Sequence, residues 1–380
     1  MARIYLDHNA TTPLAPSVRA AMLDVLGARF GNPSSLHTEG RAARAVVEDA
    51  RREVAKLVAA HADEVVFTSG GTESDQLAIV GAARARRRET GRDRVVSSPI
   101  EHPAVHGALA ALAAEGFVIT LARVDDRGTL DLEQLHKLVD DRTALVSIAV
   151  ANHEIGVRAA VEQIAAITHG AGALLHCDAV QATGKLPLDV RALDVDLMSL
   201  SAHKIHGPKG AGALICRRGV TLDPLVTGGH QERERRAGTE NVVGIAGLGA
   251  AVVFARSELL PSAERVARLR DRLEAGALAL GARRFGGDAR VANTSSLGFA
   301  DVPGELLAMS LDLDGVAVAT GAACSSGSLA PSPVLLALGC DRQTALTAVR
   351  FSLGHATSEA EIDDVLAMLP KKILQIRQAR

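Results

Sequence analysis

Apolar residues recur with a helical period early in the chain. In "RAARAVVEDARREVAKLVAA", residues 41–60, the side chains of Val47, Ala50, Val54 and Leu57 fall on one face, with arginine and glutamate opposite. A stripe that repeats every three to four residues is typical of an amphipathic helix packed on a core. The pattern therefore predicts a helix at the surface of a folded domain.

Short runs rich in valine, isoleucine and leucine follow at intervals, with helical patterns between several of them. The segment "EVVFTSGGTESDQLAIVGAARARR" predicts a strand, a glycine turn and a helix. Strands that alternate with helices indicate a mostly parallel sheet with helices on both faces. In such sheets ligands bind at the carboxyl ends of the strands. The later runs cover residues 94–97, 117–121, 144–150, 173–178, 196–199 and 211–216.

The pattern changes after about residue 255. A charged helix, "SAERVARLRDRLEAG", leads into a region with its own strands and helices, and Ser358 and Glu361 form a predicted capping box for the last helix. We predict an α/β protein with a doubly wound large domain, residues 15–258. A smaller α+β domain is predicted from residues 1–14 and 259–380.

Composition excludes several classes of partner. The chain of 380 residues is 47% apolar and 23% charged, with a formal net charge of −2. Binding to nucleic acid or anionic membranes usually leaves a basic excess, so neither is expected. The longest apolar run, residues 242–255, is shorter than the ~18 residues of a membrane span and is interpreted as a buried packing helix. The N-terminus lacks the apolar region of a signal peptide, which favours a cytoplasmic location.

The four cysteines are spaced singly, which argues against a zinc ribbon or a thioredoxin-like site and favours a reducing compartment without a bound metal. Cys177 and Cys216 lie in apolar strands and are interpreted as structural, whereas the role of Cys340 stays open. Cys324 differs, because "ATGAACSSGSL" has the composition of a mobile, solvated loop. A thiol with so few apolar neighbours calls for a chemical explanation.

Two strand ends carry candidates for anion binding and nucleophilic chemistry. In "TSGGTES", Gly71 and Thr72 start a helix whose free amides can bind phosphate, although such a turn can also be only a turn. In "SAHKIHGPKG", Lys204 follows a buried strand, where burial lowers a lysine pKa and favours Schiff-base chemistry. Ser201 and His203 flank it and could hold a phosphate. The alternative is a lysine that simply ends the strand.

Two further strand ends complete a pattern. Asp178 closes the strand in "LLHCDAVQATG", with Gln181 shortly after, and His102 stands between a strand and a helix in "SSPIEHPAV". Each could be only a helix cap or a packed ring. Pyridoxal phosphate, however, requires a lysine, an acid at its ring nitrogen and an anion cradle, and a histidine can stack on its ring. One cofactor thus explains all four strand ends.

At this point the sequence resembles the cysteine desulfurases of the NifS/IscS type, within the fold-type I pyridoxal-phosphate enzymes. The resemblance covers nearly the whole chain and implies a homodimer that takes sulfur from L-cysteine. The products would be L-alanine and a protein-bound persulfide. The motifs are "YLDHNATTP", "FGNPSSLH", "FTSGGTESD", "EHPAV", "HCDAVQATGKLP", "SAHKIHGPKG", "RRAGTENV", "GAACSSGS" and "VRFSLG".

The resemblance also implies roles for the cofactor site. Lys204 would link covalently to the cofactor, His102 would stack on its ring and move protons, and Asp178 would hold the ring nitrogen protonated. Gln181 would donate to the phenolic oxygen. The phosphate would be bound by Gly71, Thr72, Ser201 and His203, joined by Thr239 of the partner subunit.

On the substrate side, the resemblance implies that Arg350 clamps the carboxylate in a bidentate pair. Asn9 and Asn32 would line the same side. Cys324 would be the nucleophile that attacks the substrate sulfur and carries it to an acceptor, and its long loop resembles that of class I members. The acceptor would be a protein, either an iron–sulfur scaffold or a thiolation enzyme.

One motif departs from the family pattern. Two asparagines commonly precede "EIG", but here "VANHEIG" has Asn152 and then His153. The second position usually bonds the phenolic oxygen, and an imidazole N–H can donate the same bond. We therefore expect both residues at the cofactor, with a shifted absorbance.

Two other interpretations remain at this stage. The same cofactor and fold also serve selenocysteine lyases, aminotransferases and other lyases. The chain could also be a docking platform without enzymatic activity in a sulfur-transfer complex, for which His153 is the supporting observation.

Overall fold

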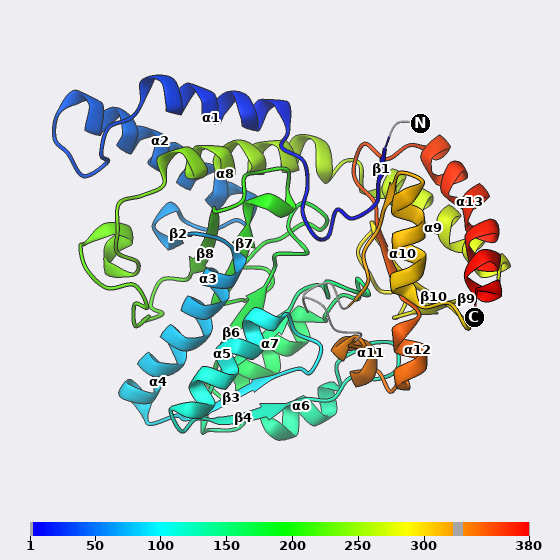
Figure 1. The fold of residues 1–380 in the computed structure, drawn as a ribbon. Helices are drawn as coiled ribbons and strands as arrows, with labels where there is room; N and C mark the ends of the chain where they lie inside the picture. The colour runs from blue at the N-terminus through cyan, green and yellow to red at the C-terminus, as the bar shows by residue number, and fades with distance from the viewer. Residues whose placement is uncertain (1–2, 322–329, 380) are drawn as a thin grey trace.

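The computed structural model describes residues 3–321 and 330–379, so Cys324 lies outside the described residues. A seven-stranded sheet forms the centre of a large lobe, and a three-stranded sheet forms the centre of a small one (Figure 1). The N-terminal segment starts in the small lobe as β1 (Ile4–Tyr5) and then crosses to α1 (Pro16–Ala28) of the large lobe.

The large sheet has the strand order β2-β8-β7-β6-β5-β3-β4. Strand β8 is antiparallel to both of its neighbours, and the other pairs are parallel, so six strands end at the same edge. This confirms the predicted mostly parallel α/β sheet. The strands are β2 (Val65–Thr68), β3 (Arg94–Ser97), β4 (Val118–Leu121), β5 (Thr143–Ala149), β6 (Leu174–Asp178), β7 (Leu197–Ser201) and β8 (Gly212–Cys216).

Helices cover both faces of this sheet, because its strands are apolar on both sides. One apolar cluster joins strand residues such as Val146 to Val54 and Leu248, and another joins Leu145 to Leu109. The first face carries α2 (Thr38–Leu57), α6 (Leu132–Leu138), α7 (Val161–Gly170) and α8 (Val242–Phe254), and the second carries α4 (Ala82–Thr90) and α5 (Pro103–Ala114). Helix α3 (Gly71–Gln76) runs through a π-helical turn (Leu77–Gly81) into α4.

Helix α8 continues through a second π-helical turn (Ala255–Leu259), so it reaches 18 residues. By length and composition alone it could cross a membrane, but half of it is buried against the rest of the protein. A Cβ at Gly249 would lie 2.8 Å from the Cβ of Ala50 on α2, which shows how closely the two helices pack. The predicted packing helix is therefore present, although it is longer than its apolar run.

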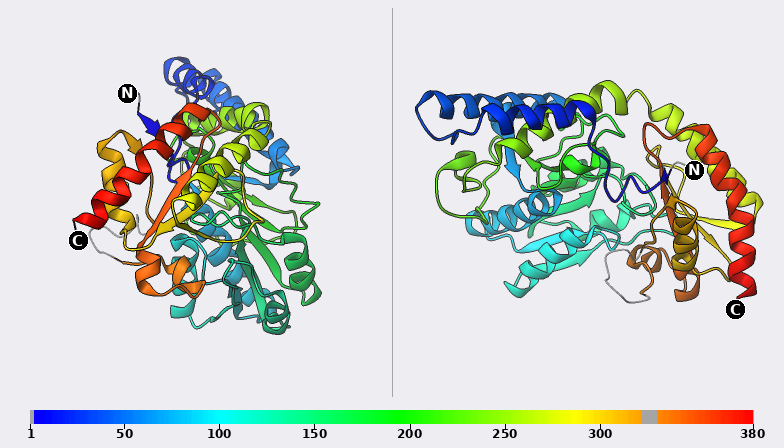
Figure 2. Two further views of the ribbon diagram at one scale, coloured as in Figure 1. Left: turned by 90° about the vertical axis from the view of Figure 1, so that its right-hand side faces the viewer. Right: turned by 45° about the horizontal axis from the view of Figure 1, so that its top comes forward.

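The small lobe is built around the antiparallel sheet β12-β10-β9. Ile4 and Leu6 share its apolar core with residues of the last third of the chain. Helix α13 lies on the outer side of this lobe (Figure 2), and Ser358 and Glu361 form its predicted capping box. The exact domain bounds stay a prediction. The elements are α9 (Ala263–Ala279), β9 (Ala282–Phe285), β10 (Thr294–Phe299), α10 (Gly304–Leu313), β11 (Val316–Ala317), α11 (Pro333–Ala337), α12 (Arg342–Leu346), β12 (Ala348–Ser352) and α13 (Glu359–Gln378).

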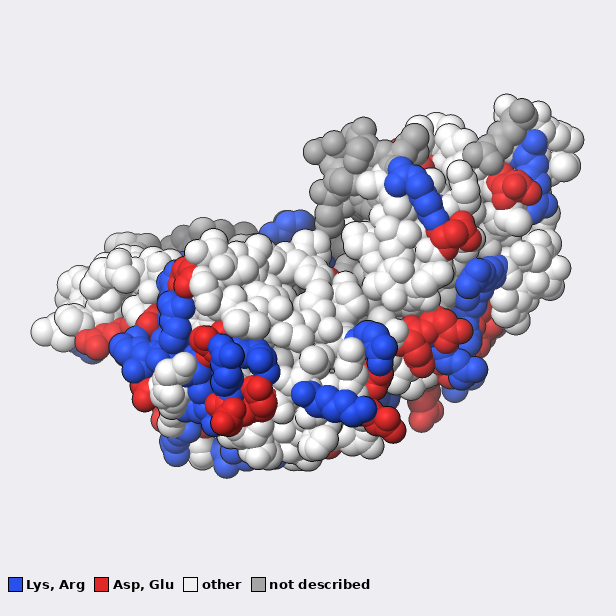
Figure 3. Space-filling view, turned by 90° about the horizontal axis from the view of Figure 1, so that it is seen from below, with Lys and Arg blue, Asp and Glu red and all other residues white. Residues whose placement is uncertain are grey.

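Charged side chains of both signs are interspersed on the face seen in Figure 3. Among the described residues many charged side chains form ion pairs, such as Arg84 with Glu115 at 2.5 Å. This face therefore carries no broad field of one sign.

Candidate active site

The carboxyl edge of the large sheet brings together four of the predicted residues. Lys204 follows β7, Asp178 ends β6, His102 follows β3 and His153 follows β5. They lie close enough to interact electrostatically. The pKa of His102 is lowered to about 4, first by burial and then by His153 and Lys204. Burial raises the pKa of Asp178, while His153 and Lys204 act in the opposite direction.

Lys204 stands at the end of a short 3₁₀ turn (Ala202–Lys204) directly after β7. Its Nζ donates to the carbonyl oxygens of Asn9 at 2.5 Å and Ala10 at 2.9 Å. The N-terminal segment is held beside this turn, because Thr12 donates through both its backbone N–H and its hydroxyl to the carbonyl of His203. The amine is thus placed where the two lobes meet.

Asp178 belongs to a group of buried carboxyl groups behind the lysine. Its Oδ1 accepts from the backbone N–H of Val180 at 2.9 Å. Burial, then the charge of Asp178, raises the pKa of Asp75 well above its ordinary value. Burial likewise raises the pKa of Glu101 to about 8, although Ser98 donates a hydrogen bond to it. Burial thus acts on all three carboxyl groups, and His153 and Lys204 are the groups that favour the charged form of Asp178.

His102 caps α5 with its ring. Its Nδ1 accepts from the backbone N–H of Ala104 at 3.1 Å, so the proton of the neutral ring is on Nε2. The low pKa keeps this ring neutral near pH 7. Its edge meets His153, with ring centroids 5.3 Å apart and planes at 76°. In this tautomer Nε2 of His102 is a hydrogen-bond donor.

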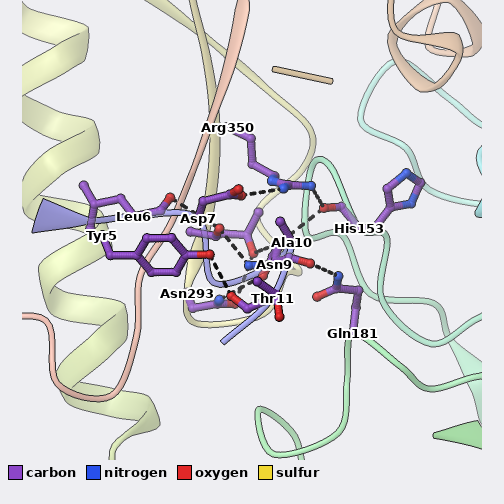
Figure 4. A network of polar contacts seen from close by, with 12 residues as sticks. Tyr5, Leu6, Asp7, Asn9, Ala10, Thr11, His153, Gln181, Asn293 and Arg350 are labelled. Atoms are coloured by element: carbon purple, nitrogen blue, oxygen red, sulfur yellow. Dashed lines mark hydrogen bonds and ion pairs between the residues drawn. The ribbon is translucent and has the colours of Figure 1, made fainter. Parts of the chain in front are cut away.

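Arg350 on β12 is fixed from two sides (Figure 4). Its guanidinium donates to Asp7 at 2.8 Å and to the carbonyl oxygen of His153 at 2.9 Å. The ring of His153 points away from this network. The Nε of Arg350 is buried without a hydrogen-bond partner. A carboxylate ligand would satisfy that donor, which is one of the two N–H groups that the predicted bidentate clamp needs.

Asn9 joins the two lobes through its side chain and backbone. Its Nδ2 donates to Thr294 at 2.9 Å and to the carbonyl of His153 at 3.3 Å, and its backbone carbonyl accepts from Gln181 at 2.9 Å. Its Oδ1 accepts from Lys185 at 2.9 Å and from Asn293 at 3.0 Å. All the bonding capacity of this amide is used within the protein.

The residues predicted for a phosphate form a small cradle. Ser201 Oγ is buried without a hydrogen-bond partner, which is the donor that a bound anion would satisfy. A Cβ at Gly71 would lie 2.8 Å from Val180 and 3.6 Å from the Cβ of Ser201, so only glycine lets the helix start come this close. Thr72 follows at the helix start, and His203 contacts Thr11 at 3.2 Å. These residues fit the phosphate of the predicted cofactor.

Other predicted residues are placed differently. Asn152 accepts from two backbone N–H groups with Oδ1 and donates to Ile100, so its amide shapes a turn. Asn32 is exposed on the segment between α1 and α2. Thr239 is exposed on the segment before α8. Their roles, like those of the other site residues, stay predictions.

Sequence analysis missed Lys185, Asp7 and Glu154. Lys185 is half-buried and donates to both Asn9 and Gln181. The signal was present in "QATGK", where Lys185 stands one helical turn after Gln181. Asp7 and Glu154 gave no local signal, because their partners are distant in the sequence.

Residues 4–365 match the family model described as aminotransferase class-V. The chain belongs to the class-V aminotransferase family. A cysteine desulfurase of Cereibacter sphaeroides is 47% identical, with 99% of this chain and 97% of the relative covered. The cysteine desulfurase NifS of Azotobacter vinelandii is 43% identical, with 99% and 94% covered. A solved NifS-like protein superposes with a TM-score of 0.92 at 38% identity, covering 98% of this chain and 99% of its own.

Membership of the class-V family at this level of identity over the whole chain makes the protein a cysteine desulfurase that depends on pyridoxal phosphate. Both predictions from the sequence are confirmed. The interpretations as another lyase or as a platform without activity are not favoured.

Proposed function

We propose that this site takes sulfur from L-cysteine, leaving L-alanine, and passes it to Cys324. The observation that carries the proposal is that Lys204, Asp178, His102 and the free Nε of Arg350 converge where the lobes meet. Pyridoxal phosphate, when bound, withdraws electrons from the amino acid and so weakens its bonds.

The cofactor would be held at three points. Lys204 would carry it covalently between turnovers, and Asp178 would keep its ring nitrogen protonated. Gly71, Thr72, Ser201 and His203 would bind its phosphate, with Thr239 of the partner subunit in a homodimer. The buried, partnerless Ser201 Oγ supports this placement.

The substrate would be oriented by its carboxylate and served by one histidine. Arg350 would bind the carboxylate with Nε, while Asp7 and the His153 carbonyl hold the guanidinium in place. His102 would move a proton at Nε2, because its Nδ1 is engaged with Ala104. While Nδ1 accepts from Ala104, Nε2 of the neutral ring carries the proton and is a donor. Nε2 can accept a proton only in the tautomer that has given up the contact with Ala104.

The sulfur step balances without an outside oxidant. The C–S bond of L-cysteine breaks and an S–S bond forms at Sγ of Cys324, while the substrate Cβ takes up a proton and becomes the methyl group of L-alanine. The Cys324 thiol loses its proton in the same step. Cys177 and Cys216 are unsuited to this role, because they are buried and burial raises the pKa of both thiols, that of Cys216 to about 11.

The persulfide would then pass to an acceptor protein, an iron–sulfur scaffold or a thiolation enzyme, in the cytoplasm. Support for an acceptor comes from the chemistry, because a persulfide must be discharged before the next turnover. The homodimer would bring Thr239, which is exposed in this chain, to the cofactor of the partner subunit.

The first experiment measures alanine and sulfide from L-cysteine with added dithiothreitol, which reduces the persulfide and releases its outer sulfur as sulfide. Wild type should give equal amounts of both. Cys324→Ala should lose both at least about 100-fold, because removal of a nucleophile leaves only residual rates, and its cofactor absorbance should stay intact. Cys340→Ala is the matched control and should keep full activity. Wild-type turnover in Cys324→Ala would show that the nucleophile is wrongly assigned.

A further inference from the structure

Glu154 is a buried carboxylate in a rigid turn after β5. It is 4% exposed. The turn is fixed by Asn152, whose Oδ1 accepts from the backbone N–H groups of Glu154 at 2.8 Å and Ile155 at 2.9 Å. Asn152 Nδ2 in turn donates to the carbonyl of Ile100 at 2.8 Å. Asn152 thus fixes the backbone from which the Glu154 side chain projects.

One oxygen of this carboxylate contacts two distant points of the chain. Ser332 Oγ donates to Oε2 of Glu154 at 2.5 Å. A Cβ placed on Gly321 would lie 2.6 Å from the same Oε2 and 2.9 Å from the Cβ of Ser332, so the Gly321 backbone lies against both. Ser332 also caps α11, since its Oγ accepts from the backbone N–H of Leu335 at 3.1 Å. Gly321 and Ser332 stand on either side of Cys324 in the sequence.

The other oxygen faces the substrate side. Glu154 Oε1 is 3.6 Å from Nε2 of His153. The ring of His153 meets His102 edge to face, and its carbonyl accepts from Arg350. Glu154 thus lies between the substrate clamp and both borders of the cysteine-bearing segment.

We propose that Glu154 is a positioning residue that fixes Gly321 and Ser332, which stand on either side of Cys324 in the sequence. The inference rests on the proposed function, because the two borders need a fixed distance to the substrate only if Cys324 is the nucleophile. Oε2 of Glu154 accepts the hydrogen bond that holds Ser332. Glycine at position 321 leaves room for this carboxylate. A shift of about 1 Å in a reacting group can cost about 100-fold in rate.

The test uses the holoenzyme with Glu154→Ala, Glu154→Gln and Ser332→Ala. Glu154→Ala should lower kcat for alanine release at least about tenfold, with KM for L-cysteine within about twofold of wild type and an unchanged cofactor absorbance. The rate of Cys324 alkylation by iodoacetamide, followed by peptide mass spectrometry, should change at least about threefold. Glu154→Gln should recover most of kcat, because its amide oxygen still accepts from Ser332. The double variant Glu154→Ala/Ser332→Ala should lose less than the two single losses combined, because both variants remove the Ser332–Glu154 contact.

Gly321→Ala should give the same defect, because its new methyl group would displace the carboxylate. Gly170→Ala is its matched control, since nothing lies within 4 Å of a Cβ there. If Glu154→Ala fails to fold, Ser332→Ala and Gly321→Ala decide the question by the same two readouts.

Two results would overturn the inference alone, provided that Cys324→Ala is inactive. One is wild-type kcat and alkylation in Glu154→Ala. The other is a shifted cofactor band and raised KM with unchanged alkylation, which would make Glu154 a cofactor contact. Full activity in Cys324→Ala would instead overturn the proposed function, and this inference with it.

Discussion

Lys185 orients two amides with a single amine. Its Nζ donates to Oδ1 of Asn9 at 2.9 Å and to Oε1 of Gln181 at 2.7 Å. Both amide nitrogens must therefore point the other way, and Gln181 Nε2 uses one hydrogen on the carbonyl of Asn9. Its second hydrogen stays available for the phenolic oxygen that the sequence assigned to it. Burial, then Lys204 and Arg350, lowers the pKa of Lys185 well below its ordinary value. Replacing the amine with an apolar group should therefore cost little folding stability.

Lys185→Met should disturb the cofactor without unfolding the protein. The thioether cannot donate, so Gln181 loses the bond that fixes its amide. We expect a shifted absorbance of the holoenzyme and a kcat about tenfold lower, since one donor to a developing charge is worth at least this much. Lys371→Met, on the exposed side of α13, is the control. An unchanged spectrum together with an unchanged kcat would contradict the orienting role.

At the scale of elements, the edge strand β2 is completed by side chains. Arg51 donates to the carbonyl of Val65 at 2.7 Å, and Glu232 accepts from the backbone N–H of Phe67 at 2.8 Å. The two side chains also form a buried bidentate pair at 2.7 and 2.8 Å. The pair holds a segment in which three successive residues from Glu232 have positive φ angles of 47°, 57° and 66°. Such backbone is strained for residues other than glycine and needs support from its surroundings.

Glu232→Ala should destabilise the protein by about 3–5 kcal/mol, because it removes the bidentate partner of a buried arginine. Arg51 would keep only the longer contact with Glu48 at 3.4 Å and its bond to the Val65 carbonyl. The affinity for pyridoxal phosphate should also fall, since Thr239 lies on the same segment. Urea unfolding and cofactor titration measure the two effects. Glu234→Ala shares the positive φ but is exposed, and it should lose much less stability. Equal losses in the two variants would rule out a special role for the buried pair.

The strands were predictable because buried parallel strands give continuous apolar runs, and all six later runs became strands with bounds within two residues. The reversed direction of β8 was not predictable, since a strand buried on both faces has the same composition in either direction. Candidate site residues that follow strands, such as Lys204 and His102, were predicted for the same reason. Asp7 was missed because its partner Arg350 is 343 residues away.

At the scale of the whole molecule, an aromatic cluster marks the junction of the lobes. The ring of His355 meets His206 at 4.7 Å and Phe254 at 5.2 Å, and His8 lies beyond His206 at 5.9 Å. Burial is the main cause that lowers the pKa of all three histidines, to about 3 for His8 and about 4 for His206. For His355, Arg265 lowers the pKa further and Glu258 opposes it.

Acid should therefore weaken the junction. Below about pH 6.5 these histidines bind protons in the unfolded state but stay neutral in the folded state. The free energy of unfolding therefore falls as the pH drops toward the folded pKa values. His355→Phe removes one such group, and its Nδ1 has no hydrogen-bond partner to lose. Urea midpoints at pH 7.5 and pH 5 should differ less in this variant than in wild type. The opposite order would show that His355 is protonated in the folded state.

Strand β1 pairs with β11, and Asp7 pairs with Arg350. These pairings determine when the N-terminal segment of a newly made chain can fold. The ribosome releases the first residues long before the strand that holds their partner exists. Contacts between such distant positions form late and slowly. The proposed substrate clamp can therefore form only when synthesis is almost finished. If Arg350 binds the substrate carboxylate as proposed, a nascent chain that has only its large sheet cannot yet bind cysteine.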